Sequence, residues 1–158
     1  MQRPRDMNPR LTIAYRPATR EDLTGIRSLL QSCDLPLAGV ADHLDTFVVA
    51  TADEHIVACA GMERYGDAAL LRSCVVDARY RRQGLGHALV WRAISLATSQ
   101  GVRELVLLTT TAEGYFPHFG FQRISREEVA DSLKASQEFA GACPASASVM
   151  RLKLALSS

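Results

Sequence analysis

The chain has 158 residues, 47% hydrophobic and 22% charged, which is the composition of an ordinary globular protein. This length fits one compact domain, and the composition excludes a disordered chain, a fibrous repeat and a membrane-embedded protein. The 18 Lys and Arg residues balance 17 Asp and Glu residues, so the net charge of +1 gives no reason to expect nucleic acid or an acidic membrane as a partner. An anion site would have to come from local clustering of basic residues.

The sequence contains four cysteines, which are Cys33, Cys59, Cys74 and Cys143. Their spacing is not that of a zinc site, so we expect no metal. Residues 1–10 are polar and Arg-rich, with no apolar segment after them, and are expected to be a flexible tail rather than a secretory signal. No stretch approaches the ~20 apolar residues needed to span a bilayer. The sequence therefore favours a cytoplasmic protein with one domain over residues 11–158.

The first predicted elements are a strand over residues 11–16 and a helix from Thr19 to about residue 33. Thr19 is an expected N-cap, with Asp22 three residues later, and apolar residues recur after it at helical spacing. A shorter helix is expected around residues 39–44. Three strands follow, at residues 47–51, 55–64 and 68–76. Turns of two or three residues join these strands, and connections this short require antiparallel pairing.

The pattern then changes to a glycine-rich turn, a helix ending near Gly101 and a buried strand at residues 104–110. Residues 68–110 therefore predict one βαβ crossover with parallel strands. The remaining elements are a short helix, a short strand, a helix with a Ser125/Glu128 capping box and a final amphipathic strand, at residues 112–119, 121–124, 125–135 and 150–156. Together these elements predict an α+β domain with a mixed, mostly antiparallel sheet and helices on both faces.

The glycine-rich turn is the most informative segment, and it consists of Arg81, Arg82, Gln83, Gly84, Leu85, Gly86 and His87. Two glycines let backbone N–H groups approach an anion closely, and the helix that follows begins with unpaired N–H donors. Arg79, Arg81 and Arg82 add positive charge, so the segment predicts a polyphosphate site. It fits neither a Rossmann fingerprint nor a Walker loop. A plain strand-to-helix connection with solvated arginines is the alternative.

The spacing Arg81-x-x-Gly84-x-Gly86, placed after an antiparallel meander, resembles the GNAT superfamily of acetyl-CoA-dependent N-acetyltransferases. A second signature of that family is similar to Ala112-x-x-x-Phe116-x-x-x-Gly120-Phe121. The resemblance implies that acetyl-CoA is the co-substrate and that the turn holds its pyrophosphate. It further implies that Cys74, Val75 and Val76 present backbone groups to the acetyl and pantetheine portion. Ala112 and Phe116 would line the pantetheine side.

Three further segments resemble the N-acetyltransferases encoded in bacterial arsenic-resistance operons, at residues 70–73, 107–112 and 138–147. The second is also similar to the acetyltransferase domain of N-acetylglutamate synthase. Both resemblances imply that the acceptor is an amino acid or a toxic amino-acid analogue. The alternatives are another amine (an antibiotic, a polyamine or a protein N-terminus) and an acyl-CoA sensor without catalysis. Dimers are common in the family, so the resemblance allows a homodimer, although no segment is typical of a dedicated interface.

Acetyl transfer to an amine needs a deprotonated amine and a proton for the leaving thiolate. Glu63 is the candidate general base, with a solvent-facing strand carboxylate as the alternative. Many family members have a Tyr as general acid where this sequence has Phe116. Tyr115 is the neighbouring candidate, although one step along a helix turns it by about 100°; a packing role is the alternative.

Arg72 and Ser73 are the candidate acceptor-binding residues. An Arg in an apolar strand is expected to have a partner, because an unpaired buried charge is costly. Arg72 could hold a substrate carboxylate in a bidentate manner. Pairing of Arg72 with Glu63 or Asp77 is the structural alternative.

Overall fold

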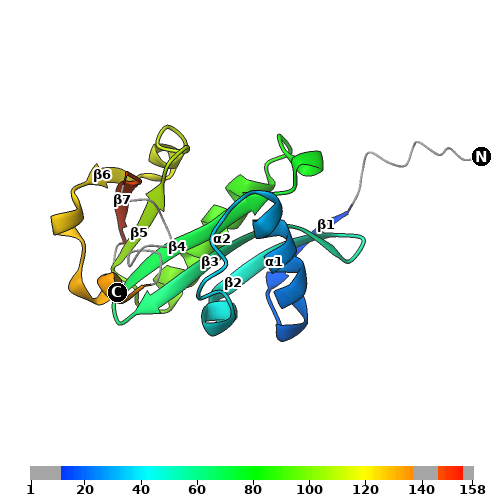
Figure 1. The fold of residues 1–158 in the computed structure, drawn as a ribbon, viewed down its shortest axis with the longest axis horizontal. Coiled ribbons are helices and arrows are strands. Elements are labelled where there is room, and N and C mark those ends of the chain that lie inside the picture. Colours follow the sequence, from blue (N-terminus) through cyan, green and yellow to red (C-terminus); the bar gives the residue numbers. More distant parts are fainter. Residues whose placement is uncertain (1–11, 137–145, 155–158) are drawn as a thin grey trace, which may run out of the picture.

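The computed structural model describes residues 12–136 and 146–154, so the expected tail at residues 1–10 lies outside it, as does Cys143 (Figure 1). A seven-stranded sheet has the order β1-β2-β3-β4-β5-β7-β6. Its strands are β1 (Ile13–Pro17), β2 (Phe47–Ala52), β3 (His55–Tyr65), β4 (Ala68–Val76), β5 (Glu104–Thr109), β6 (Gln122–Ile124) and β7 (Ser148–Lys153). The α-helices are α1 (Leu23–Ser32) and α2 (Leu85–Ser99). Short 3-10 helices are η2 (Arg20–Asp22), η3 (Ala41–Thr46), η4 (Ala78–Tyr80), η5 (Phe116–Phe119), η6 (Arg126–Glu128) and η7 (Asp131–Ala135).

The strand pairing confirms the predicted fold class. Strands β1 to β4 pair antiparallel in sequence order, β4 and β5 are parallel, and β7 pairs antiparallel with both β5 and β6. The β4–α2–β5 unit is the expected βαβ crossover. None of the helices in the described part of the chain is long and apolar enough to cross a membrane.

The two α-helices cover opposite faces of the sheet (Figure 1). Successive strand residues point to opposite sides, so a strand contributes side chains to both faces. On one face, Ala60 and Met62 of β3 belong to the core that includes Leu89 of α2. On the other face, Cys59 packs with Ile26 of α1. Helices therefore lie on both faces, as predicted.

The predicted helix over residues 125–135 is wrong. The capping box between Ser125 and Glu128 forms, but it opens only η6, and the backbone at Val129 becomes extended (φ −73°, ψ 138°). Val129 and Leu133 are buried with Val149 in a small core beside the sheet. Burial of apolar side chains here outweighs the local helix signal, because most helical stability in proteins comes from tertiary packing. The helices expected near residues 39–44 and 112–119 are likewise 3-10 turns, η3 and η5.

A bulge in β4 divides the sheet. Cys59 pairs with Val75 and Gly61 with Arg72, so β4 has one residue more than β3 between these pairs. Within the bulge, Ser73 has a left-handed backbone (φ +58°), which costs a non-glycine residue on the order of 1 kcal/mol. Strand β4 pairs with β5 only through Ala68, Ala69 and Leu70. Beyond Leu70 the two parallel strands are no longer paired, and a cleft lies between them.

Candidate active site

The cleft between β4 and β5 has a volume of about 290 Å³. That value is near the lower end of the ~300–1,000 Å³ typical of small-molecule sites. The cleft brings together many of the residues singled out from the sequence, namely Arg72, Ser73, Cys74, Val75, Val76, Gly86, Ala112, Tyr115 and Phe116. Glu63 and the rest of the glycine turn are not among its lining residues. The two segments proposed for pantetheine therefore face one cavity.

The glycine turn begins α2 at one end of this cleft. Gly84 is the N-cap with a left-handed backbone (φ +84°), and the first intrahelical bond runs from the Ala88 N–H to the Gly84 carbonyl (3.0 Å). The N–H groups of Leu85, Gly86 and His87 consequently have no acceptor within the helix. Such a terminus, with its positive dipole end, is suited to bind phosphate.

Gly86 lies where the turn, β4 and Tyr115 meet. A Cβ at Gly86 would be 3.3 Å from Cγ2 of Val76 and 3.8 Å from the Tyr115 hydroxyl. The lack of a side chain thus keeps the start of α2 open toward the cleft. Leu85 has a different task, because its side chain is buried in the core beneath α2.

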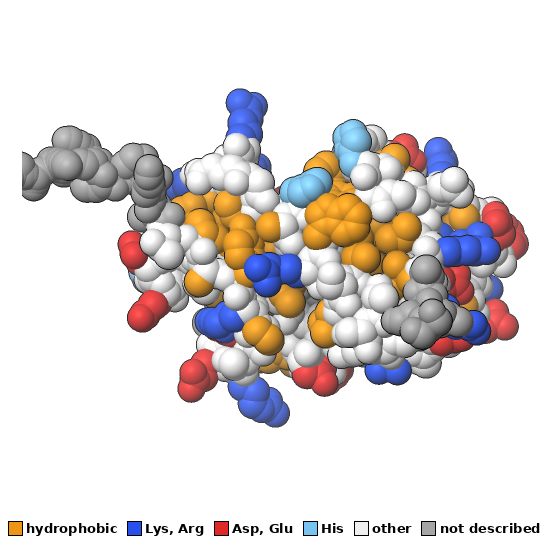
Figure 2. All heavy atoms as spheres, turned by 180° about the vertical axis from the view of Figure 1, so that it is seen from behind, with side chains coloured by type: hydrophobic (Ala, Val, Ile, Leu, Met, Phe, Trp, Pro, Cys, Tyr) orange, Lys and Arg blue, Asp and Glu red, His pale blue; other side chains and the backbone are white. Residues whose placement is uncertain are grey.

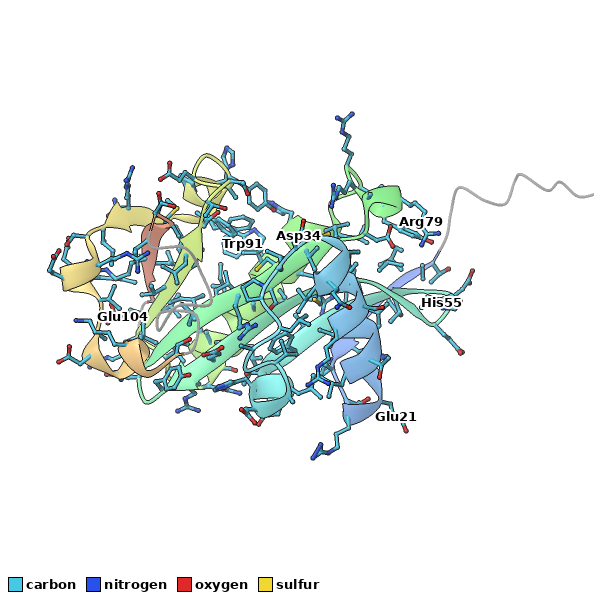
Figure 3. All side chains as sticks on the ribbon, viewed as in Figure 1. Glu21, Asp34, His55, Arg79, Trp91 and Glu104 are labelled. Carbon is cyan, nitrogen blue, oxygen red and sulfur yellow. The ribbon has the colours of Figure 1, made fainter. Side chains whose placement is uncertain are left out.

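The three arginines near the turn do not act as one cluster. Arg79 forms an ion pair with Asp77 (3.2 Å), and this hydrogen bonding lowers the pKa of the Asp77 carboxyl. Arg81 donates from Nε to the Val76 carbonyl (3.0 Å), and Arg82 is exposed with a left-handed backbone (φ +67°). Figure 3 shows Arg79 on the loop that follows β4. The charge of Arg79 is therefore engaged locally, while Arg81 and Arg82 form the first part of the turn, before its glycines.

The rotation of about 100° expected between Tyr115 and Phe116 does not apply, because residues 112–115 do not form an α-helix. Residues 112–115 form a turn, and the 3-10 helix η5 begins at Phe116. Tyr115 lines the cleft and is 38% exposed, whereas Phe116 both lines the cleft and packs against Phe121 in the core. Burial, and to a smaller extent the nearby Cys74, raise the pKa of the Tyr115 phenol. A protonated hydroxyl thus faces the cavity.

Glu63 and Arg72 form an ion pair on the α1 side of the sheet (Oε2 to Nη1, 2.5 Å), with both side chains at most 1% exposed. The alternative of a solvent-facing Glu63 is therefore wrong. Tyr65 donates its hydroxyl to the other carboxylate oxygen (2.7 Å), and Arg72 Nε donates to Ser73 Oγ (3.0 Å). Burial acts to raise the pKa of Glu63, but the hydrogen bonds from Tyr65 and Arg72 outweigh it, and the net direction is downward.

Some lining residues had no signal in the sequence. Leu35 and Pro36, which follow α1, reach the cleft. Thr109 and Thr111, at and after the end of β5, also line it, and they belong to the segment 107–112 that carried the resemblance. Among the described residues, the cleft lining contains no Asp, Glu or His, and no group of three or more metal-ligating side chains could hold a metal ion. Cys59 and Cys74 line the cleft in the thiol form, and burial strongly raises the pKa of Cys59.

An aromatic group lies on α2 next to the turn. His87 accepts a hydrogen bond at Nε2 from the Trp91 indole N–H (3.1 Å), and both rings pack on Phe119. Trp91 is 43% exposed. Figure 2 shows hydrophobic and histidine side chains together on this face of the molecule, and Figure 3 labels Trp91. The Trp91 indole N–H is therefore engaged by His87 next to the N-terminus of α2.

A model of the acetyltransferase (GNAT) family matches residues 11–140, which is most of the chain. This chain belongs to the GNAT family. In that family, it is 29% identical over 89 residues to an uncharacterized N-acetyltransferase of Chlorobaculum tepidum, covering 56% of this chain and 57% of the relative. It is 32% identical over 88 residues to the amino-acid acetyltransferase of Pseudomonas fluorescens, covering 54% of this chain and 20% of that protein. The chain thus spans only part of both curated relatives.

Among solved GNAT-type structures, the fold matches N-acetylglutamate synthase of Neisseria gonorrhoeae complexed with coenzyme A and N-acetyl-glutamate. The TM-score is 0.78 at 20% identity, over 92% of this chain and 36% of that one. At this identity the match shows a shared fold. Residues 138–139 and 143–145 of the arsenic-operon resemblance lie outside the described residues, so that part of the GNAT chain has no structural description here.

Proposed function

We propose that this chain transfers the acetyl group of acetyl-CoA to the amine of a small molecule. The amine is that of an amino acid or a toxic amino-acid analogue, as in the arsenic-resistance type. The observation that carries the proposal is the cleft between β4 and β5 with the glycine turn of α2 at one end. Membership of the GNAT family supports the reaction class, and likeness to an amino-acid acetyltransferase supports the acceptor class.

In this proposal the pyrophosphate binds the N–H groups of Leu85, Gly86 and His87, with Arg81 and Arg82 nearby. The pantetheine arm follows the cleft between Cys74–Val76 on β4 and the segment containing Ala112 and Phe116. Because β4 and β5 are unpaired there, backbone groups on β4 are available to an amide-containing ligand. The turn would act through its backbone, so Gln83 contributes little beyond its main chain.

The amine nitrogen attacks the thioester carbon, a C–N bond forms, and the C–S bond breaks to release the CoA thiolate. Tyr115 is positioned to donate its proton to that sulfur, because its hydroxyl lies in the cleft beside Gly86. Glu63 was the predicted base, but its carboxylate is paired with Arg72 and is not among the residues lining the cleft. We therefore assign removal of the amine proton to solvent and give Glu63 a supporting role.

Thiol release from acetyl-CoA, followed against a panel of amino acids, amino-acid analogues, antibiotics, polyamines and N-terminal peptides, tests this function. We expect turnover with an amino acid or analogue and none without an amine. Turnover confined to another amine class would contradict the acceptor assignment. Clear acetyl-CoA binding by calorimetry with no turnover on any amine would favour a sensor. A cytoplasmic location, the 11–158 domain boundary and a homodimer stay predictions.

A further inference from the structure

The loop over residues 35–39, which we call the acceptor loop, joins α1 to η3. Its first two residues, Leu35 and Pro36, line the cleft beside Arg72 and Ser73. The other described lining residues belong to β3, β4, α2, β5 or residues 111–116. The turn proposed for the cofactor opens α2, which covers one face of the sheet, whereas the acceptor loop follows α1, which covers the other. An amine that approaches from the α1 side would thus meet this loop first.

Arg72 binds the backbone of the acceptor loop, although the two are far apart in sequence. Arg72 donates from Nη2 to the Pro36 carbonyl (3.0 Å) and from Nη1 to the Ala38 carbonyl (2.5 Å). The same Nη1 pairs with Glu63, and the guanidinium is fully buried. A planar guanidinium with donors in a fixed fork therefore ties two carbonyl groups of the loop to a buried charge on β3.

Gly39 brings the loop backbone directly against this ion pair. Its φ is +83°, and a Cβ there would be 3.1 Å from Nη1 of Arg72 and 3.2 Å from Oε2 of Glu63. Both distances are tighter than ordinary van der Waals contact, and the atoms they involve are fixed by hydrogen bonds on both sides. The path of the loop and the place of the ion pair are thus mutually dependent.

We propose that Glu63 and Arg72 are positioning residues: their buried ion pair fixes the acceptor loop as the wall against which the amine substrate aligns. This inference rests on the proposed acetyl transfer and assigns a determinant of acceptor binding within it. Arg72 would act on the acceptor through Pro36 and its neighbours rather than by contact with a substrate carboxylate. The loop would contact the acceptor equally before and during the reaction, so its displacement weakens acceptor binding and raises KM with little change in kcat.

The test compares two glycines with nearly equal backbone conformations. Gly39→Ala places a methyl group against the ion pair, whereas Gly101→Ala (φ +81°) meets no atom within 4 Å, so both carry similar backbone strain. Arg72→Lys keeps the positive charge beside Glu63 but loses the fork to the loop. We expect Gly39→Ala and Arg72→Lys to raise the acceptor KM about tenfold. Their kcat and calorimetric acetyl-CoA affinity should change less than about twofold, and Gly101→Ala should match the wild type.

Equal effects of the two glycine variants, or a parallel loss of acetyl-CoA affinity, would overturn the proposal. A second arm separates positioning from direct contact, using an acceptor and its analogue without the carboxylate. If Arg72→Lys alone abolishes discrimination between the two, while Gly39→Ala retains it, Arg72 binds the carboxylate directly and the positioning role is wrong. If both variants lose discrimination together, positioning is supported.

Hydrogen exchange of the amides in residues 35–40 gives a measurement that needs no turnover. Exchange there should be faster in Gly39→Ala and Arg72→Lys than in the wild type, and unchanged in Gly101→Ala. If the wild type acetylates no amine, the proposed function fails, and unchanged exchange in all variants would separately refute the anchoring of the loop. Glu63→Gln provides a further variant should Arg72→Lys not fold, with the same expected exchange pattern.

Discussion

At the scale of single residues, Tyr115 brings a phenol hydroxyl into the cleft. Tyr115 precedes by one residue Phe116, the position at which the family resemblance implies a tyrosine as general acid. The 3-10 geometry that begins at Phe116 makes this possible, because the segment before it is a turn rather than a helix. Phe116 uses the neighbouring position for packing against Phe121. Since burial raises the pKa of Tyr115 above its ordinary value of about 10, the phenol stays protonated at neutral pH.

Tyr115→Phe should lower kcat about a hundredfold or more, because general acid catalysis typically contributes 10²–10⁴-fold. Acetyl-CoA affinity should stay within about twofold, since the ring is retained. In the wild type, kcat/KM should rise with pH toward the pKa of the acceptor amine, and fall only above about pH 10 as the phenol ionises. A pH–rate series on both proteins measures this. A rising limb in the acid range, below the ordinary carboxyl pKa, would instead indicate a carboxylate base such as Glu63, whose pKa is lowered.

At the scale of elements, the junction between β4 and α2 separates two kinds of glycine. Gly84 has a left-handed backbone, so any other residue there is strained by about 1–2 kcal/mol whatever it does to a ligand. Gly86 has no positive φ, and only the space between Val76 and Tyr115 limits its side chain. A change at Gly86 therefore tests the anion site with less disturbance of the backbone.

Gly86→Val should weaken acetyl-CoA binding at least about tenfold, because its side chain would crowd Val76 and the N–H groups that face the phosphate. Calorimetric titration with acetyl-CoA measures the effect, and thermal unfolding serves as the control. Leu85 and Leu89 still anchor α2 in the core, so the unfolding temperature should change by only a few degrees. An affinity equal to that of the wild type would refute the assignment of the phosphate turn.

At the scale of the whole molecule, the antiparallel meander and the βαβ crossover could be expected from turn lengths, apolar runs and one intervening helix. The meander at residues 47–76 needed only short connections, and the parallel pairing of β4 with β5 followed from the intervening helix. Two features escaped prediction, namely the place of β7 between β5 and β6 and the loss of the helix from Ser125. The helix from Ser125 gave way to burial of Val129 and Leu133 against the distant Val149, a tertiary contact with no local signal.

Part of the candidate site could likewise be predicted from the sequence, and part of it could not. Gly84 and Gly86 were recognisable because a phosphate site needs particular backbone chemistry at one place in the chain. The acceptor loop was not, since Pro36 reaches Arg72 only through the folded sheet. The partner of Arg72 could be narrowed to Glu63 or Asp77 from the cost of buried charge, and the register of β3 against β4 selects Glu63.

The stability of the whole fold should also depend on the ion pair that joins β1 to the start of α1. Arg16 binds Asp22 through both nitrogens (2.7 and 2.9 Å), and Asp22 accepts the Thr19 N–H. The hydrogen bond from Arg16 is the main cause that lowers the pKa of Asp22 to about 2. A lowered carboxyl pKa stabilises the folded state above the unfolded value of 3.8, and this contribution is lost as the pH falls through about 2.

Asp22→Asn should therefore lower the free energy of unfolding by about 1–2 kcal/mol at pH 7, the value being limited by the partial exposure of Arg16. The difference between variant and wild type should shrink between about pH 4 and pH 2. Urea unfolding at pH 7 and pH 2.5 measures it. A difference that is the same at both pH values would show that the carboxylate charge does not stabilise this junction.

The bulge at Ser73 has a consequence for how this protein could be changed. The bulge is a main-chain register shift of β4 against β3, next to the stretch where β4 no longer pairs with β5, so replacement of side chains around it leaves this register in place. Recognition of the amine, in contrast, would depend on a short loop tied down by one ion pair. The backbone architecture of the cleft and its selectivity for the amine would then depend on different parts of the chain. Changes confined to residues 35–39 would then alter which amines bind, while the residues that bind the acyl donor remain unchanged.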